Sequence, residues 1–149
     1  METDRIIAYT MGMDKRDELL RRVEEHLSRR EEILFAYAHG SFLRDKYFRD
    51  LDIGVFLDQE HFKAVGYNYE IRLEEELERL PGVEFPVDVR LLNSASISFQ
   101  YKAVRGRLLL DMAPDVRVNF CTRVMSRYLD IRPVLLYHTK EAFSYETRR

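Results

Sequence analysis

The sequence predicts an α+β fold, in which a small mixed sheet is flanked by helices and followed by a C-terminal helix. Short apolar segments with strand-like alternation lie between longer segments with helical spacing. With 149 residues, the chain has the length of one domain and can bury a proper core. We therefore expect a single domain over residues 1–149, with its core at about 30–112 and a helical extension at about 114–145.

The N-terminal third should contain one helix and one strand. Helical spacing predicts a helix over residues 14–32, with Asp14 as a suitable N-cap. Its apolar positions are Leu19, Leu20, Val23 and Leu27. An apolar run at 33–38 follows and is expected to form a strand that leads directly into Gly40.

Two more strands and a helix are predicted in the middle of the chain. Strict alternation over residues 50–58 indicates a strand with one clearly apolar face. A helix is expected at about 64–80, because Pro81-Gly82 would stop it. Alternation over residues 85–92 then predicts a third strand.

The C-terminal part is predicted to hold a short helix, a strand and a long helix. Polar residues at 93–96 can cap a helix at about 97–105, and Gly106 suits its C-cap. A strand at 107–110 and a last helix at about 114–129 should follow.

Pro133 is expected to interrupt the last helix and to leave residues 134–137 as a separate apolar segment. That segment, with Phe143 and Tyr145, either docks against another chain or packs on the body of the domain.

The most informative motif is Gly40-Ser41, followed after eight residues by Asp50 and Asp52. Two aspartates at i and i+2 on a strand point to the same face, so they can share one divalent cation, most plausibly Mg²⁺. Gly40 allows the backbone to approach a ligand closely, and Ser41 offers a hydroxyl and amide groups to a triphosphate if it opens a helix. This combination indicates phosphoryl or nucleotidyl transfer.

A third carboxylate, Asp88, lies on the polar face of the third predicted strand. Clustered carboxylates repel one another unless a cation neutralises them, so three acids in one cleft favour a metal site. Asp88 would complete the coordination or accept the proton of an attacking hydroxyl. The alternative is an exposed acid on an edge strand.

Composition narrows the classes of function. The net charge is −2 although 34% of the residues are charged, which is not the basic surface of a general nucleic-acid binder. The single cysteine, Cys121, rules out an internal disulfide framework and fits a reducing compartment. With no signal-peptide pattern and no apolar run near ~20 residues, we expect a cytoplasmic protein without a membrane span.

These motifs resemble the signature of the DNA polymerase β-type nucleotidyltransferase superfamily. Within it, the size and flanks are similar to the minimal nucleotidyltransferases (MNT), the antitoxin partners of HEPN ribonuclease toxins. The resemblance covers roughly residues 30–137 and includes a C-terminal pattern. The residues of that pattern are Phe120, Arg123, Val124, Tyr128, Asp130 and Pro133. One departure is the segment 42–49, which is shorter than in many members and contains no glycine.

The resemblance implies a palm-type nucleotidyltransferase domain that transfers AMP from ATP to a protein hydroxyl. The acceptor would be a tyrosine of a cognate HEPN toxin, held in a hetero-oligomer and silenced by AMPylation. Asp50, Asp52 and Asp88 would be catalytic residues and Mg²⁺ ligands, and Gly40 and Ser41 would bind the nucleotide.

Arg44, Lys46 and Arg49 lie between the two motifs and are candidates for phosphate contact, but equally for solvent exposure. Two other classes of function stay open: a catalytically silent antitoxin that neutralises by binding, and a nucleotidyltransferase for small molecules. Against the second, antibiotic nucleotidyltransferases usually use a large additional helical domain for the acceptor, and we expect none in a sequence of 149 residues.

Overall fold

The computed structural model of the protein describes residues 6–146, with side chains up to residue 141. It contains five α-helices, one 3-10 helix and four strands within that range. In chain order these are α1 (Met13–Ser28), β1 (Ile33–His39), η1 (Ser41–Leu43), β2 (Leu51–Leu57), α2 (Gln59–Ala64), α3 (Tyr69–Glu78), β3 (Val87–Leu91), α4 (Ile97–Val104), β4 (Arg107–Asp111) and α5 (Pro114–Glu146). The predicted α+β class is confirmed.

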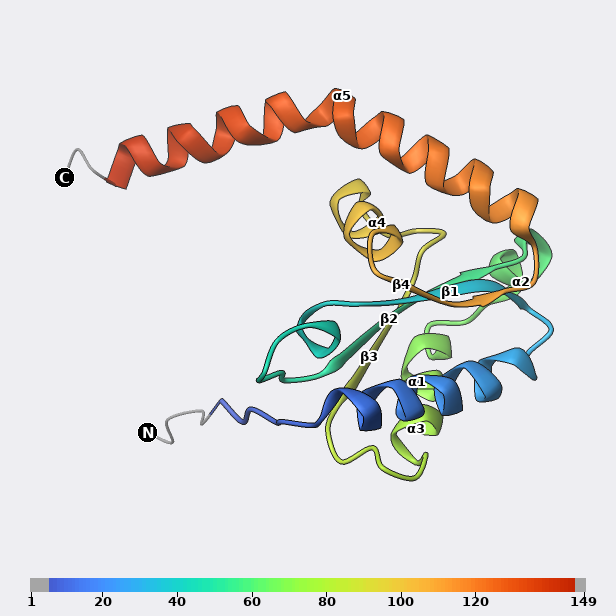
Figure 1. The fold of residues 1–149 in the computed structure, drawn as a ribbon. Coiled ribbons are helices and arrows are strands. Elements are labelled where there is room, and N and C mark those ends of the chain that lie inside the picture. The colour runs from blue at the N-terminus through green and yellow to red at the C-terminus, as the bar shows by residue number, and fades with distance from the viewer. Residues whose placement is uncertain (1–5, 147–149) are drawn as a thin grey trace.

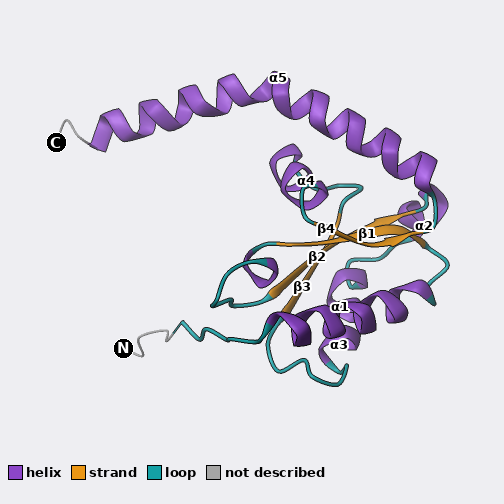
Figure 2. Cartoon of the chain, in the orientation of Figure 1, coloured by secondary structure: helices purple, strands orange, loops and turns teal. Residues whose placement is uncertain are grey.

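The strands form one mixed sheet in the order β3-β2-β1-β4. Strand β1 pairs antiparallel with β2 and β4, whereas β2 and β3 are parallel. Helices α1 and α3 cover one face, and α4 with the first half of α5 covers the other (Figures 1 and 2). The three-layer arrangement explains why almost every residue of β1 is buried.

The core has one part on each side of the sheet. Below it, the apolar stripe of α1 and the buried leucines of α3 join the inward-facing residues of β2 and β3 in one cluster. Above it, Phe35 of β1 stacks on Phe56 of β2 with ring centroids 4.7 Å apart, and Phe120 of α5 packs against both rings. The two parts hold β2 from both faces and fix which residues point up or down.

Strand β3 lies at an edge of the sheet, but glutamates of α3 cover its outer amide groups. The pairs are Val87 N–Glu78 Oε1 at 3.0 Å, Val89 N–Glu74 Oε1 at 3.0 Å and Leu91 N–Glu70 Oε2 at 3.2 Å. The i, i+4, i+8 spacing of the glutamates matches alternate residues of the strand. The row satisfies the amides and closes the edge to other strands.

The structure corrects several predicted boundaries. Helix α1 begins after Gly12, so Asp14 lies in its first turn and not at the N-cap. The helix predicted at 64–80 is the shorter α3, because residues 65–68 lie outside helical geometry. A separate short helix, α2, precedes it and is capped by Asp58. Gly106 does follow α4, but its backbone is not left-handed. A Cβ there would lie 2.1 Å from the carbonyl oxygen of Ala38, so close packing on β1 requires the glycine.

The expectation that Pro133 interrupts the last helix is wrong. Helix α5 is continuous from Pro114 to Glu146 with Pro133 inside it, and Figure 1 shows it bent near its middle. A proline removes one backbone hydrogen bond and bends a helix, but the hydrogen bonds of the helical turns on both sides can keep the helix continuous. Within residues 6–146, none of the helices combines the length and apolar character that a bilayer crossing requires.

We predict that the glutamate row stabilises the β3 edge. Replacing Glu70, Glu74 and Glu78 together with alanine should lower the free energy of unfolding by about 1 kcal/mol per amide left unpaired. The variant should also self-associate more, because it exposes an open edge. Urea denaturation and size-exclusion chromatography measure the two effects. Glu75→Ala, an exposed change on the same helix, is the control and should leave both unchanged.

Candidate active site

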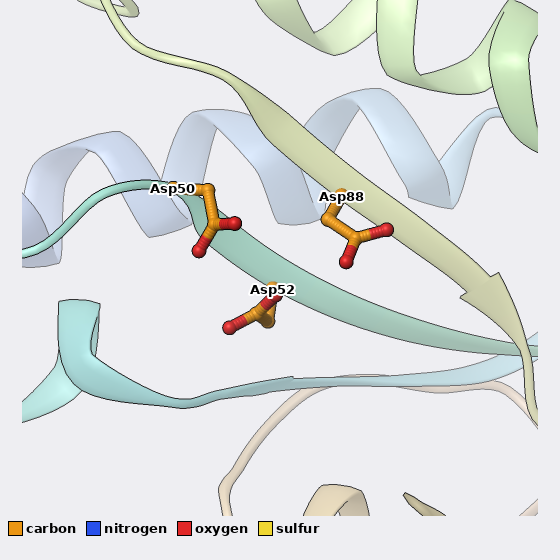
Figure 3. Close-up of side chains that lie close together, drawn as sticks. All are labelled: Asp50, Asp52 and Asp88. Carbon is orange, nitrogen blue, oxygen red and sulfur yellow. The ribbon is translucent and has the colours of Figure 1, made fainter. Parts of the chain in front are cut away.

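Three carboxylates meet on the upper face of the sheet. Asp52 lies in β2 directly opposite Asp88 in β3, and Asp50 precedes β2 by one residue. One oxygen from each of Asp50, Asp52 and Asp88 lies within 4.8 Å of the others. Figure 3 shows the three side chains turned toward one another from the two neighbouring strands. The structure therefore brings together the three acids that the sequence singled out.

The apolar neighbours of these acids explain their orientation. Leu51 and Ile53 are fully buried in the lower core, and Val87 and Val89 are nearly so. Because side chains alternate along a strand, burial of these residues turns Asp52 and Asp88 to the opposite face. The parallel register then aligns the two acids across the strand pair.

Electrostatics at this cluster favour a bound cation. Burial, and then the charges of Asp50 and Asp88, raise the pKa of Asp52 to about 6. Burial and the charge of Asp88 also raise the pKa of Asp50. Arg90 opposes these effects only partly, since its Nε lies 3.8 Å from Asp88 Oδ2 and its side chain is exposed. A set of half-buried carboxylate oxygens with too little positive charge fits a hard divalent cation.

Gly40 forms the wall of the cluster on the side of β1. Its φ of 86° is left-handed, and a Cβ would lie 2.4 Å from Asp52 Oδ2. Only glycine satisfies both conditions. Ser41 opens the 3-10 helix η1, and the backbone of the predicted phosphate cradle passes beside Asp52.

A buried arginine, which the sequence analysis missed, holds the loop between the two motifs. The guanidinium of Arg16 donates to the carbonyl oxygens of Phe42, Asp45 and Lys46 at 2.7–3.2 Å. It also lies over the rings of Phe42 and Phe48, with distances of 5.6 and 5.0 Å to their centroids. The short loop without glycine is therefore ordered from α1. Lone arginines in charged helices give no sequence signal for such a role.

The three predicted phosphate contacts are placed differently. Arg44 lines a cleft beside Gly40, and the charge of Arg49 is close enough to lower the pKa of Asp50 against the dominant effect of burial. Lys46 is exposed, and its Nζ lies 5.4 Å from the ring centroid of Tyr47. No described contact brings Lys46 to the acid cluster.

His39, at the end of β1, pairs with Asp52 across β1 and β2, so it lies in one row with Asp52 and Asp88. Its ring meets Phe99 edge-on, and Nε2 is buried without a hydrogen-bond partner in the described part of the chain. Burial lowers the pKa of His39 although Asp88 raises it, which favours the neutral ring.

The cleft that Arg44 lines has a volume of about 410 Å³ and adjoins Gly40. Its other wall is helix α4, which contributes Tyr101, Lys102 and Arg105. Sequence analysis treated this helix only as a structural element. Two cations at i and i+3 just before a glycine were the available signal, and such spacing is common on solvated helices.

Comparisons with known proteins agree with this geometry. The family model described as polymerase beta, nucleotidyltransferase matches residues 21–115. A solved toxin–antitoxin complex, MntA-HepT, has a chain that is 14% identical, with a TM-score of 0.61, and the match covers 89% of this chain and 99% of that one. No curated protein matches this sequence.

Two further structures share the fold. One is a tri-AMPylated Shewanella oneidensis HEPN toxin in complex with an MNT antitoxin, 16% identical with a TM-score of 0.63 over 83% of this chain and 98% of that one. The other is a toxin–antitoxin structure with AMP-PNP, 19% identical with a TM-score of 0.62 over 89% and 99%. At these identities the likeness establishes a common fold.

We predict that Asp52 makes the metal-free protein less stable as the pH rises. Its pKa is about 6 in the folded state and about 4 in the unfolded chain, so the folded state binds more protons between these values. The stability that this proton contributes is present below pH 4 and is lost as the pH rises through 6. Asp52→Asn should therefore gain about 1 kcal/mol over the wild type between pH 4 and 7, allowing for solvent screening. Urea titrations in EDTA measure the difference, and a constant difference would contradict the prediction.

Proposed function

The chain belongs to the polymerase beta nucleotidyltransferase family, and from this premise we propose that it transfers AMP from ATP to a hydroxyl group of a partner protein. The acceptor is a tyrosine of a HEPN-type ribonuclease toxin, and the chain is its antitoxin. The observation that carries the proposal is the convergence of Asp50, Asp52 and Asp88 beside the left-handed Gly40. The fold shared with toxin–antitoxin complexes, one of them with a tri-AMPylated toxin, supports the choice of acceptor.

The residues divide the chemistry among them. Asp50 and Asp52 would hold Mg²⁺, which when bound would neutralise charge on the phosphates. The backbone at Gly40 and Ser41 positions the donor, and Arg44 and Arg49 contact its phosphates. The acceptor oxygen bonds to the α-phosphorus, and the bond from that phosphorus to the bridging oxygen breaks, so pyrophosphate leaves with the electron pair. Asp88 takes the hydroxyl proton or completes the coordination of the cation.

An exposed apolar stripe on α5 supports a protein partner. Val118, Met125, Leu129 and Leu136 follow one another at intervals of seven, four and seven residues, which places them on one line of the helix. Between 37 and 61% of each side chain is exposed. An apolar line of this length on a helix is typical of a protein–protein contact.

The second half of α5 extends away from the body of the domain (Figure 1). Val134, Leu135, Leu136 and Tyr137 are all exposed, so this segment does not pack on the body as one alternative held. The side chains of Phe143 and Tyr145 lie outside the described residues. We propose that this part of α5 docks on the toxin.

We predict that the acid cluster is required for AMP transfer. With labelled ATP, Mg²⁺ and the proposed HEPN-type partner, the wild type should label the partner. Asp50→Ala with Asp52→Ala should reduce the labelling rate at least about 100-fold, because charge on the phosphates is no longer neutralised. Asp45→Ala, which removes an exposed carboxylate from the neighbouring loop, is the control.

Each outcome selects among the candidate functions. An unlabelled partner that is nevertheless inhibited would identify a binding antitoxin without catalysis. An unlabelled partner without inhibition would contradict the antitoxin role and favour a small-molecule acceptor. Repeating the assay with EDTA separates Mg²⁺ dependence from transfer.

We also predict that the α5 stripe forms the complex. Leu129→Glu with Leu136→Glu should weaken the affinity for the partner at least about 100-fold, because charges replace two apolar contacts of the interface. Isothermal titration calorimetry measures the affinity, and circular dichroism checks the fold. Arg123→Glu, which introduces the same charge on α5 away from the stripe, should have a smaller effect. Unchanged affinity in the double variant would place the interface elsewhere.

A further inference from the structure

An arginine lies beside the third acid of the cluster, on the same face of the sheet. Arg90 follows Asp88 by two residues in β3, so the two side chains share one face of the strand. The Nε atom of Arg90 lies 3.8 Å from Asp88 Oδ2. The strand that supplies the third carboxylate therefore also supplies a positive charge next to it.

Phe99 of α4 holds this guanidinium at the edge of the cluster. The guanidinium carbon of Arg90 lies 4.9 Å from the centroid of the Phe99 ring. The same ring meets His39 edge-on, with 5.0 Å between the ring centroids. His39 belongs to the row that also contains Asp52 and Asp88. Although 56% of the Arg90 side chain is exposed, the contact with Phe99 keeps its charge beside this row.

The pair of Arg90 and Asp88 acts on the charge of the site more than on the stability of the fold. Neither residue has another ion-pair partner in the part of the chain that the structure describes. An exposed pair of this kind contributes little to folding. The charge of Arg90 also lowers the pKa of Asp52, against the larger effects of burial and of the other two acids.

The charges at the cluster match one divalent cation. When ionised, Asp50, Asp52 and Asp88 carry three negative charges, and Arg90 offsets one of them. Arg49 also acts on Asp50, but its side chain is exposed in the preceding loop and is assigned to the donor phosphates in the proposed function. The two negative charges that remain equal the charge of a single Mg²⁺. A second divalent ion beside Asp88 would be repelled by the guanidinium.

We propose that Arg90 takes the place of a second metal ion, so that the acid cluster holds one divalent cation per chain. The inference rests on the proposed function for the cation at Asp50 and Asp52. Arg90 is a positioning residue in this arrangement: it neutralises and orients Asp88 and touches neither the donor nor the acceptor. Removing its charge should open a second cation site at Asp88.

The test counts the Mn²⁺ ions that bind to the full chain, without nucleotide, by electron paramagnetic resonance of the free ion. The wild type should bind one ion per chain, and Arg90→Gln should bind two. Asp88→Asn added to Arg90→Gln should return the count to one, because the second ion loses its ligand. Circular dichroism and thermal melting establish that each variant is folded.

Two control variants separate charge from a general effect of substitution. Arg90→Lys keeps a positive charge beside Asp88 and should still bind one ion. Arg79→Gln removes an exposed cation after the end of α3, outside the cluster, and should also bind one.

The stoichiometry decides the inference. Two ions on the wild type, or a single ion on Arg90→Gln at any affinity, would overturn it. No ion on the wild type would overturn it together with the cation assigned to Asp50 and Asp52. AMP transfer to the partner is measured in parallel. If the counts are as expected but the partner is not labelled, the role of Arg90 stands and the transfer reaction fails. If the wild type labels the partner and binds two ions, transfer stands and the role of Arg90 fails.

Discussion

The parallel pairing of β2 with β3 is the constraint on which the site depends. It places Asp52 opposite Asp88, and a shift by one residue would turn one of them into the lower core. Two features hold this register. The lower core buries Leu51, Ile53, Val87 and Val89, and the glutamates of α3 bind alternate amides of β3. The second contact matters because β3 is an edge strand and has only one strand neighbour.

Two contacts bring the predicted phosphate cradle to the acid cluster. Gly40 combines a left-handed backbone with a close approach to Asp52 Oδ2, and Arg16 holds the following loop by its carbonyl groups. The loop has no glycine at which to turn, so hydrogen bonds from a neighbouring helix take over that role. The energy for burying the guanidinium is offset by four carbonyl acceptors, the fourth being that of Met11, and by two aromatic rings.

Sequence patterns predicted the elements that alternate or repeat, and missed those that depend on distant contacts. The strands around Asp52 and Asp88 were predictable because every second residue is apolar, and the same pattern fixed the direction of the acids. The prediction that Pro133 interrupts the last helix was wrong because local propensity does not show how well a long helix tolerates one missing hydrogen bond. Arg16 and Lys102 were missed because most of the residues around them belong to segments 26 or more residues away. In the sequence alone they look like solvated charges.

Opposite charges lie on the two sides of Gly40. In this way a chain with a net charge of only −2 holds both an acidic cluster and a basic cleft. On one side, three carboxylates repel one another, and burial raises the pKa of Asp52 and Asp50. On the other, three cations line a cavity without an acid. Neither half is neutral by itself: a cation would neutralise the acids, and an anionic group would neutralise the basic wall. Gly40 lies on the boundary of the two halves: it lines the cleft, and a Cβ there would lie 2.4 Å from Asp52 Oδ2. The long helix α5 completes this arrangement, because Tyr128 supports the basic wall while other positions of the same helix present an apolar stripe to solvent.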